Sequence, residues 1–117
     1  MIDIEIPGLR LVSEMNSREH WRARARRAAT QRKAVLMHLR ARAERPAATP
    51  LRVTITRVAP RRLDSDNAVT SGKHVRDAVA DWLGIDDRRD DLVRYEVTQE
   101  QRPKAYAVRV RIEEVGA

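Results

Sequence analysis

The residues best able to do chemistry lie in the stretch LDSDN at residues 63–67, directly after the basic pair Arg61-Arg62. If this stretch is extended, Asp64 and Asp66 project to the same side, with their Cα atoms roughly 6–7 Å apart. Two carboxylates at that separation can chelate a hard divalent cation. Since the neighbouring arginines attract phosphates, the pattern indicates metal-assisted chemistry on nucleic acid.

The same stretch has an ordinary structural interpretation. Asp and Asn are common in turns and at helix N-termini, so Asp66 or Asn67 could simply cap a following helix. Local sequence favours neither interpretation over the other. A calcium-binding hand is excluded, because a loop that starts at Asp64 has Ala68 at its fifth position and Val75 at its twelfth, where acids are needed.

Further charged residues follow along the chain. Lys73, Asp77 and Asp81 have the i, i+4, i+8 spacing of one helix face. Such a row is usually an exposed ion-pair ladder worth a few tenths of a kcal/mol, although Lys73 could instead stabilise charge on a phosphate. The spacing alone favours the ladder. The pair Asp86-Asp87, next to Arg88-Arg89, is by itself a weak signal that a hydrophilic turn explains equally well.

Composition limits the classes of protein. The 117 residues carry 24 Lys+Arg against 17 Asp+Glu, which is a net charge of +7 and favours a polyanionic partner. The absence of cysteine excludes disulfides and thiolate metal sites. No apolar run approaches the roughly 18 residues of a membrane span, so we expect a cytoplasmic protein without a membrane partner. Only four aromatic residues are present, too few for a platform that stacks a single strand.

The elements that position these residues begin with a short strand over residues 2–6, stopped by Pro7-Gly8. Asn16 and Glu19 resemble a capping box ahead of a long helical pattern that Pro46 stops. Residues 16–45 hold ten Lys+Arg and two Glu, so their net charge of +8 exceeds that of the whole chain. We therefore expect this helix to face phosphates through Arg22, Arg26 and Lys33.

The second half predicts a strand over residues 51–58 and a helix over residues 68–83, with Gly72 as its weak point and Gly84 as its C-cap. Strand patterns at residues 92–99 and 106–115 are most simply an antiparallel hairpin. The prediction is one α+β domain over residues 1–117, with the order β-α-β-α-β-β and a mixed sheet.

Taken together, these motifs resemble the RusA family of Holliday junction resolvases, in its phage and prophage form. The family pattern is D-x-D-N, a lysine, an aspartate four residues after that lysine, and G-hydrophobic-x-D-D. The matching positions here are Asp64, Asp66, Asn67, Lys73, Asp77 and Gly84 to Asp87. The resemblance covers most of the chain. It departs from the best-known members in two places, because Lys73 stands three residues late, with Thr70 at the usual position, and Leu63 replaces a basic residue.

The resemblance implies a homodimeric endonuclease of DNA recombination and repair, with no small-molecule cofactor. It would use Mg²⁺, or alternatively Mn²⁺, to resolve four-way DNA junctions by paired symmetric nicks. Asp64, Asp66 and Asp87 would hold the metal, Asp86 would be a fourth ligand or a supporting carboxylate, and Lys73 would act in catalysis. The implied DNA-binding residues are Arg61, Arg62, Asn67, Lys73, Arg22, Arg26 and Lys33.

Two other functions stay open. One is a non-catalytic basic DNA-binding protein, such as a degenerate prophage copy, and the other is a metal-dependent nuclease for other branched DNA or for RNA. There is also a geometric difficulty, because a straight helix over residues 68–83 is roughly 24 Å long and separates Asp66 from Asp87. Either the helix breaks near Gly72, or it starts later, or the acids meet across the two-fold axis of a dimer.

Overall fold

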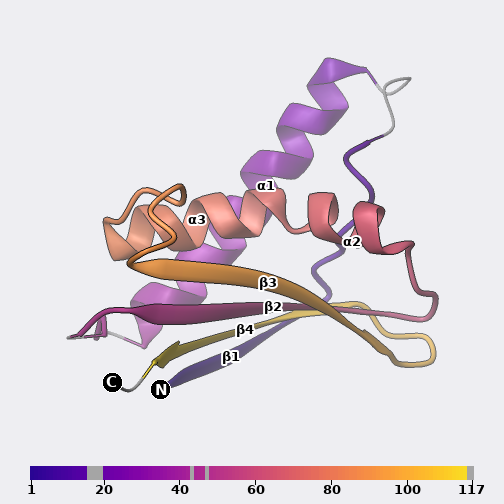
Figure 1. Ribbon diagram of the computed structural model, residues 1–117. Helices are drawn as coiled ribbons and strands as arrows, with labels where there is room; N and C mark the ends of the chain where they lie inside the picture. Colours follow the sequence, from indigo (N-terminus) through magenta and orange to yellow (C-terminus); the bar gives the residue numbers. More distant parts are fainter. Residues whose placement is uncertain (16–19, 43, 47, 116–117) are drawn as a thin grey trace.

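The chain forms two layers, a four-stranded sheet and three helices that all lie on one face of it (Figure 1). The computed structural model describes residues 1–15, 20–42, 44–46 and 48–115. In chain order the elements are β1 (Ile2–Pro7), α1 (Trp21–Ala41), β2 (Leu51–Ala59), α2 (Ser65–Ser71), α3 (Lys73–Leu83), β3 (Val93–Gln101) and β4 (Ala107–Glu114). This confirms the α+β class and the order β-α-β-α-β-β, with the second helical region divided into α2 and α3.

The sheet is mixed, as predicted, and its strands lie in the order β1-β4-β2-β3. β4 pairs antiparallel with both β1 and β2, while β2 and β3 are parallel. The parallel pair needs a crossover connection, which α2 and α3 provide. The segment that joins β2 to β3 therefore carries most of the candidate functional residues.

The predicted hairpin between the last two strands is wrong, because β2 lies between β3 and β4. The short connection between them passes across the end of β2, where the Arg102 backbone N–H donates to the Ala59 carbonyl oxygen at 3.1 Å. The two sequence patterns at residues 92–99 and 106–115 do form strands, namely β3 and β4. The short loop, however, did not identify which strand is the neighbour.

Alternating side chains divide the sheet into an apolar face and a polar face. Ile2, Ile4 and Ile6 of β1 are buried beneath the helices, as are Val53 and Ile55 of β2. The helices contribute the buried residues Val35, Leu39, Val75, Ala78, Val79 and Trp82. Burial of these side chains is the main driving force that holds the helical layer on the sheet.

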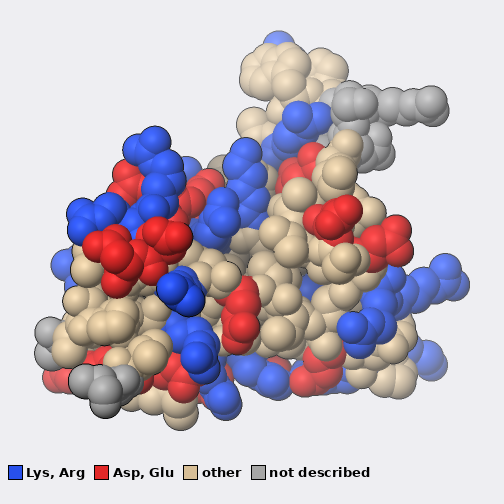
Figure 2. Space-filling model, in the orientation of Figure 1, with Lys and Arg blue, Asp and Glu red and all other residues tan. Residues whose placement is uncertain are grey.

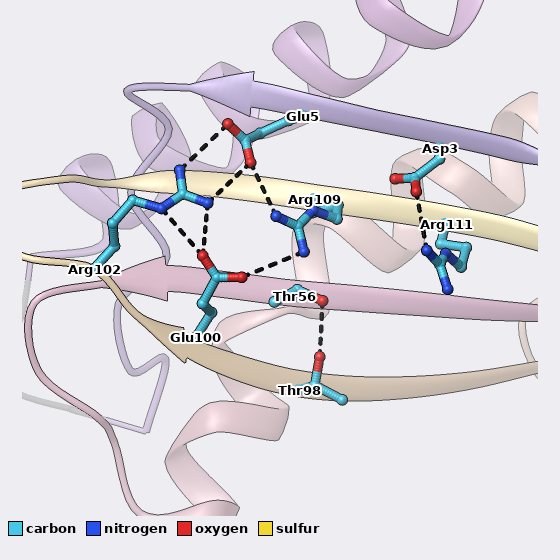
Figure 3. A network of polar contacts seen from close by, with 8 residues as sticks. All are labelled: Asp3, Glu5, Thr56, Thr98, Glu100, Arg102, Arg109 and Arg111. Carbon is cyan, nitrogen blue, oxygen red and sulfur yellow. Dashed lines mark hydrogen bonds and ion pairs between the residues drawn. The ribbon is translucent and has the colours of Figure 1, made fainter.

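The outer face of the sheet, opposite the helices, is polar and balanced in charge. Arg109 of β4 bonds Glu5 of β1 and Glu100 of β3, and Arg102 joins the same two carboxylates (Figure 3). Its charged residues are Arg52, Arg94, Arg102, Arg109 and Arg111 against Asp3, Glu5, Glu96, Glu100 and Glu113. The excess positive charge of the protein therefore lies on the helical side and in the loops.

The first helix runs from Trp21 to Ala41 and is capped by His20, whose Nδ1 accepts the Arg22 backbone N–H at 3.1 Å. The predicted capping box of Asn16 and Glu19 lies outside the described residues. Of the helices in the described ranges, none is both long and apolar enough to cross a membrane.

Candidate functional site

Asp64 and Asp66 lie at the start of α2, after the chain has left β2 and entered the helical layer. Asp64 is the N-cap residue, and Asp66 is in the first helical turn. The expectation of an extended stretch is therefore wrong beyond Asp64. The physical reason is the preference of Asp, Ser and Asn for the first positions of a helix, which lets α2 begin earlier than residue 68.

Both carboxylates are nevertheless uncommitted. Asp64 and Asp66 are exposed. Although Asp64 occupies the N-cap position, its side chain accepts no capping hydrogen bond. Within the part of the chain that the structure describes, neither residue has a salt-bridge partner. The two acids suit the N-terminal end of a helix, where negative charge is favourable, but no capping hydrogen bond occupies the Asp64 carboxylate.

The segment just before Asp64 is held by side chains from the sheet. Gln99 of β3 pairs with the Leu63 backbone, accepting its N–H at 2.8 Å and donating to its carbonyl oxygen at 2.9 Å. Arg57 of β2 donates to the Arg61 carbonyl oxygen at 2.7 Å. These bonds fix where the chain leaves the sheet, so they fix the position of Asp64 as well. Arg61 and Arg62 themselves are exposed.

Asn67 joins α2 to the segment that follows β1. The Ser13 hydroxyl donates to Asn67 Oδ1 at 2.6 Å. Next to it, Glu14 is almost buried and accepts two hydrogen bonds of 2.8 Å from Arg27 of α1. His74 Nε2 of α3 lies 3.4 Å from Glu14 Oε1. Asn67 is therefore already partnered within the protein, which argues for a positioning role rather than for direct contact with DNA.

The cluster of Glu14, Arg27 and His74 was not identified from the sequence. Burial raises the pKa of Glu14, but hydrogen bonds and charge from Arg27, with a smaller effect from His74, outweigh it and hold that pKa below its ordinary value. The only signal in the sequence was an acid between two apolar segments. The partners of Glu14 are 13 and 60 residues away, so local pattern could not reveal them.

The second acidic pair, Asp86 and Asp87, follows α3 and forms ion pairs with arginines. Asp87 Oδ2 lies 3.3 Å from Arg76 Nε, and the Arg76 guanidinium also lies over the Tyr95 ring. Asp86 accepts hydrogen bonds from the Arg88 side chain and backbone, which lower its pKa to about 2. The turn interpretation therefore describes Asp86 well, and its role as a metal ligand stays a prediction.

The two acidic pairs are separated by both α2 and α3, because Asp64 and Asp66 lie at the start of α2 and Asp86 and Asp87 follow α3. Helix α3 has 11 residues, so it is about 16 Å long. Figure 2 shows separate acidic areas over α2 and over the loop after α3. Among the described residues, no group of three or more acids or histidines could hold a metal ion. One chain in this arrangement does not bring Asp64, Asp66 and Asp87 together.

The break near Gly72 does occur, but it does not solve the problem of distance. Gly72 ends α2 and precedes α3, which starts at Lys73. A Cβ atom at Gly72 would come 3.1 Å from Val97 Cγ2, so the helical layer passes very close to the sheet at this point. The alternative in which the helix starts later is wrong, because helical structure begins at Ser65.

Lys73 is exposed at the first position of α3. The predicted ladder is not formed among the described residues, since Asp81 instead pairs with Arg32 of α1 at 2.7 Å. Asp77 and Asp81 line a surface groove of about 540 Å³ with Asp86, Asp87, Arg32 and Arg88. Lys73 therefore remains available for another partner.

The first helix carries a basic stripe, formed by Arg22, Arg26, Lys33 and Arg40. At 3.6 residues per turn, spacings of four, seven and seven keep these side chains within about 40° of one another. All four are exposed, and α1 contains no acidic residue. The stripe is about 27 Å long, which suits a row of phosphates along a nucleic-acid backbone.

Comparison with known proteins adds no family. No model of a protein family matches the chain, and no curated protein has a matching sequence. The likeness to RusA-type resolvases stays a prediction from the motifs.

Proposed function

We propose that this protein is a cytoplasmic, homodimeric, Mg²⁺-dependent endonuclease that cuts branched DNA, with four-way junctions as its substrate. The observation that carries the proposal is the uncommitted pair Asp64 and Asp66, which lies beside Arg61 and Arg62 at the start of α2. These two exposed carboxylates have no ion-pair partner in the described residues, so their oxygens are free to bind a divalent cation. A divalent ion bound there would polarise a phosphodiester.

A second copy of the chain would complete the metal site. Asp87 lies beyond α3 from Asp64 and Asp66, so the three ligands that the resemblance implies cannot meet within one chain as it is arranged here. In a symmetric dimer, the α3 C-terminal end of one copy can approach the α2 start of the other. Two such sites suit a four-way junction, which has two strands to cut symmetrically.

DNA would lie on the helical side of each protomer. The outer face of the sheet is balanced in charge, whereas the basic stripe presents four cations without an acidic partner in the described ranges. Lys73 and Arg62 are exposed on the same α2–α3 layer as the acid pair. Contacts of this kind follow the backbone, which fits recognition of DNA shape more than of sequence.

A non-catalytic DNA-binding protein is the second candidate, and one observation favours it. Asp86 and Asp87 are both engaged by arginines, which is what a structural turn requires. In that case the basic stripe would bind DNA, and no phosphodiester would be cut.

The direct test is to incubate a labelled four-way junction with the wild-type protein, with and without Mg²⁺. We expect paired nicks at symmetric positions that need Mg²⁺ and disappear in Asp66→Asn. The substitution keeps the size of an exposed side chain, so it should leave folding and DNA affinity nearly unchanged. Asp90→Asn, which changes an exposed acid in the loop after α3, is the matched control and should cut normally.

Each result has a distinct meaning. Binding of the junction without cutting would favour the second candidate. Equal cutting of a linear duplex would contradict selectivity for branched DNA. Cutting of RNA would favour instead a metal-dependent nuclease that acts on RNA. Cutting that survives in Asp66→Asn would remove the acid pair from the site.

A further inference from the structure

Trp21 is the large apolar side chain that solvent reaches most freely beside the basic stripe. Its exposed fraction is 65%, whereas Trp82 is 6% exposed in the core. The first turns of α1 project beyond the rest of the helical layer (Figure 1). An exposed indole costs free energy in water, since it leaves a large apolar area unburied. Packing in the core therefore does not explain why a tryptophan stands at this exposed position.

The surroundings of the ring are built for stacking. The His20 ring stacks on Trp21 with centroids 5.8 Å apart and an interplanar angle of 27°. His20 is held in place because its Nδ1 caps α1. The Arg22 guanidinium lies 5.4 Å from the centroid of the indole. The Trp21 indole is thus orientated by the His20 ring, and the Arg22 guanidinium lies beside it.

We propose that Trp21 stacks on a nucleobase exposed at the branch point of DNA, an inference that rests on the DNA-binding part of the proposed function. Bases inside a duplex are stacked on both sides and offer no free face. Bases at a junction or a strand end do offer one. A single ring can serve one such base, even though the chain has too few aromatic residues to stack a strand.

Charge favours a nucleic acid over an apolar protein partner. Arg22 and Arg26 begin the basic stripe within the first two turns of α1, and no acid lies on that helix. An apolar partner would bury these cations without compensation, whereas the phosphates that flank an exposed base would pair with them. The stripe would follow the backbone of an arm while the indole meets the base at its end.

The test uses binding rather than cutting, so it is carried out without Mg²⁺ in the Asp66→Asn background. The probes are a four-way junction with 2-aminopurine at the branch point and a linear duplex of the same sequence. We expect the junction to quench the emission of Trp21, with buried Trp82 as a constant background. Trp21→Ala should weaken junction binding about tenfold and leave duplex binding unchanged. Trp21→Phe should retain part of the effect.

Arg26→Gln is the matched control, because a backbone contact should weaken junction and duplex binding to the same extent. Sedimentation of Trp21→Ala checks the assembly state. Unchanged junction affinity in Trp21→Ala, or an equal loss for both DNAs, would overturn the inference. A change from dimer to monomer would also overturn it, since the indole would then belong to a contact between copies. If the wild type never cuts but its junction binding depends on Trp21, only the nuclease proposal fails.

Discussion

At the scale of residues, the site is defined by which charges have partners and which do not. Asp64 and Asp66 are exposed and unpaired in the described part of the chain, whereas Asp87 is paired with Arg76. The sequence identified these acids but could not rank them, because pairing depends on residues that the fold brings together. Glu14 is the clearest case, since nothing near it in the chain indicates Arg27 or His74 as partners.

Glu14→Gln should lower the free energy of unfolding at pH 7 by about 2 kcal/mol, because it removes the charge that Arg27 faces in a nearly buried position. The pKa of Glu14 in the folded state lies below its ordinary value of 4.5. Its stabilisation is therefore complete above pH 4.5 and is lost as the pH falls through the lower folded pKa. Urea denaturation should show the two proteins converging in acid.

Glu44→Gln is the control for that comparison, since Glu44 is exposed. Its stability should match the wild type at every pH. Equal stability of Glu14→Gln and the wild type at pH 7 would show that the cluster contributes nothing to folding.

At the scale of elements, the sequence predicted most of the strands and helices and missed two things. It placed β1, β2 and the end of α3 well, because alternation and the Gly84 C-cap are local signals. Gly84 indeed has a left-handed backbone with φ of 72°. It misjudged the neighbour of β3, which depends on packing between distant segments. It also misjudged the start of α2, although the preference of Asp, Ser and Asn for the first positions of a helix is a local signal.

Gly72→Ala should destabilise the protein by about 1 kcal/mol, because the new methyl group would meet Val97 Cγ2 at 3.1 Å and the β-branched Val97 in the sheet has little freedom to move away. Combining it with Val97→Ala should cost less than the sum of the two single changes, since the smaller residue makes room. A double-mutant cycle from urea denaturation measures this coupling. Strict additivity would mean that Gly72 is not needed for close approach to β3.

At the scale of the whole molecule, the two faces differ in charge and should differ in function. The outer face of the sheet pairs its arginines with carboxylates (Figure 3), while the basic stripe on α1 has no acidic partner among the described residues. The net charge of +7 in the sequence already predicted a polyanionic partner. Only the fold could separate the arginines that pair within the protein from those that remain available.

Replacing Arg26, Lys33 and Arg40 with Gln should weaken duplex binding strongly and lower its salt dependence by about two to three units of log K against log salt concentration. Each stripe residue would release about one counterion from DNA. The same measurement on Arg109→Gln with Arg111→Gln, on the outer face, should give the wild-type slope. A larger change of slope from the outer-face pair than from the stripe would mean that DNA binds the outer face of the sheet.

If one metal site needs acids from two copies, a mixed dimer of two inactive variants should recover activity. Asp66→Asn and Asp87→Asn are each expected to be inactive. In a heterodimer of the two, a shared arrangement leaves one site with both Asp66 and Asp87 intact. Purified through two different tags, the heterodimer should nick a four-way junction in one strand with Mg²⁺. A heterodimer that forms normally but cuts neither strand would contradict the shared site.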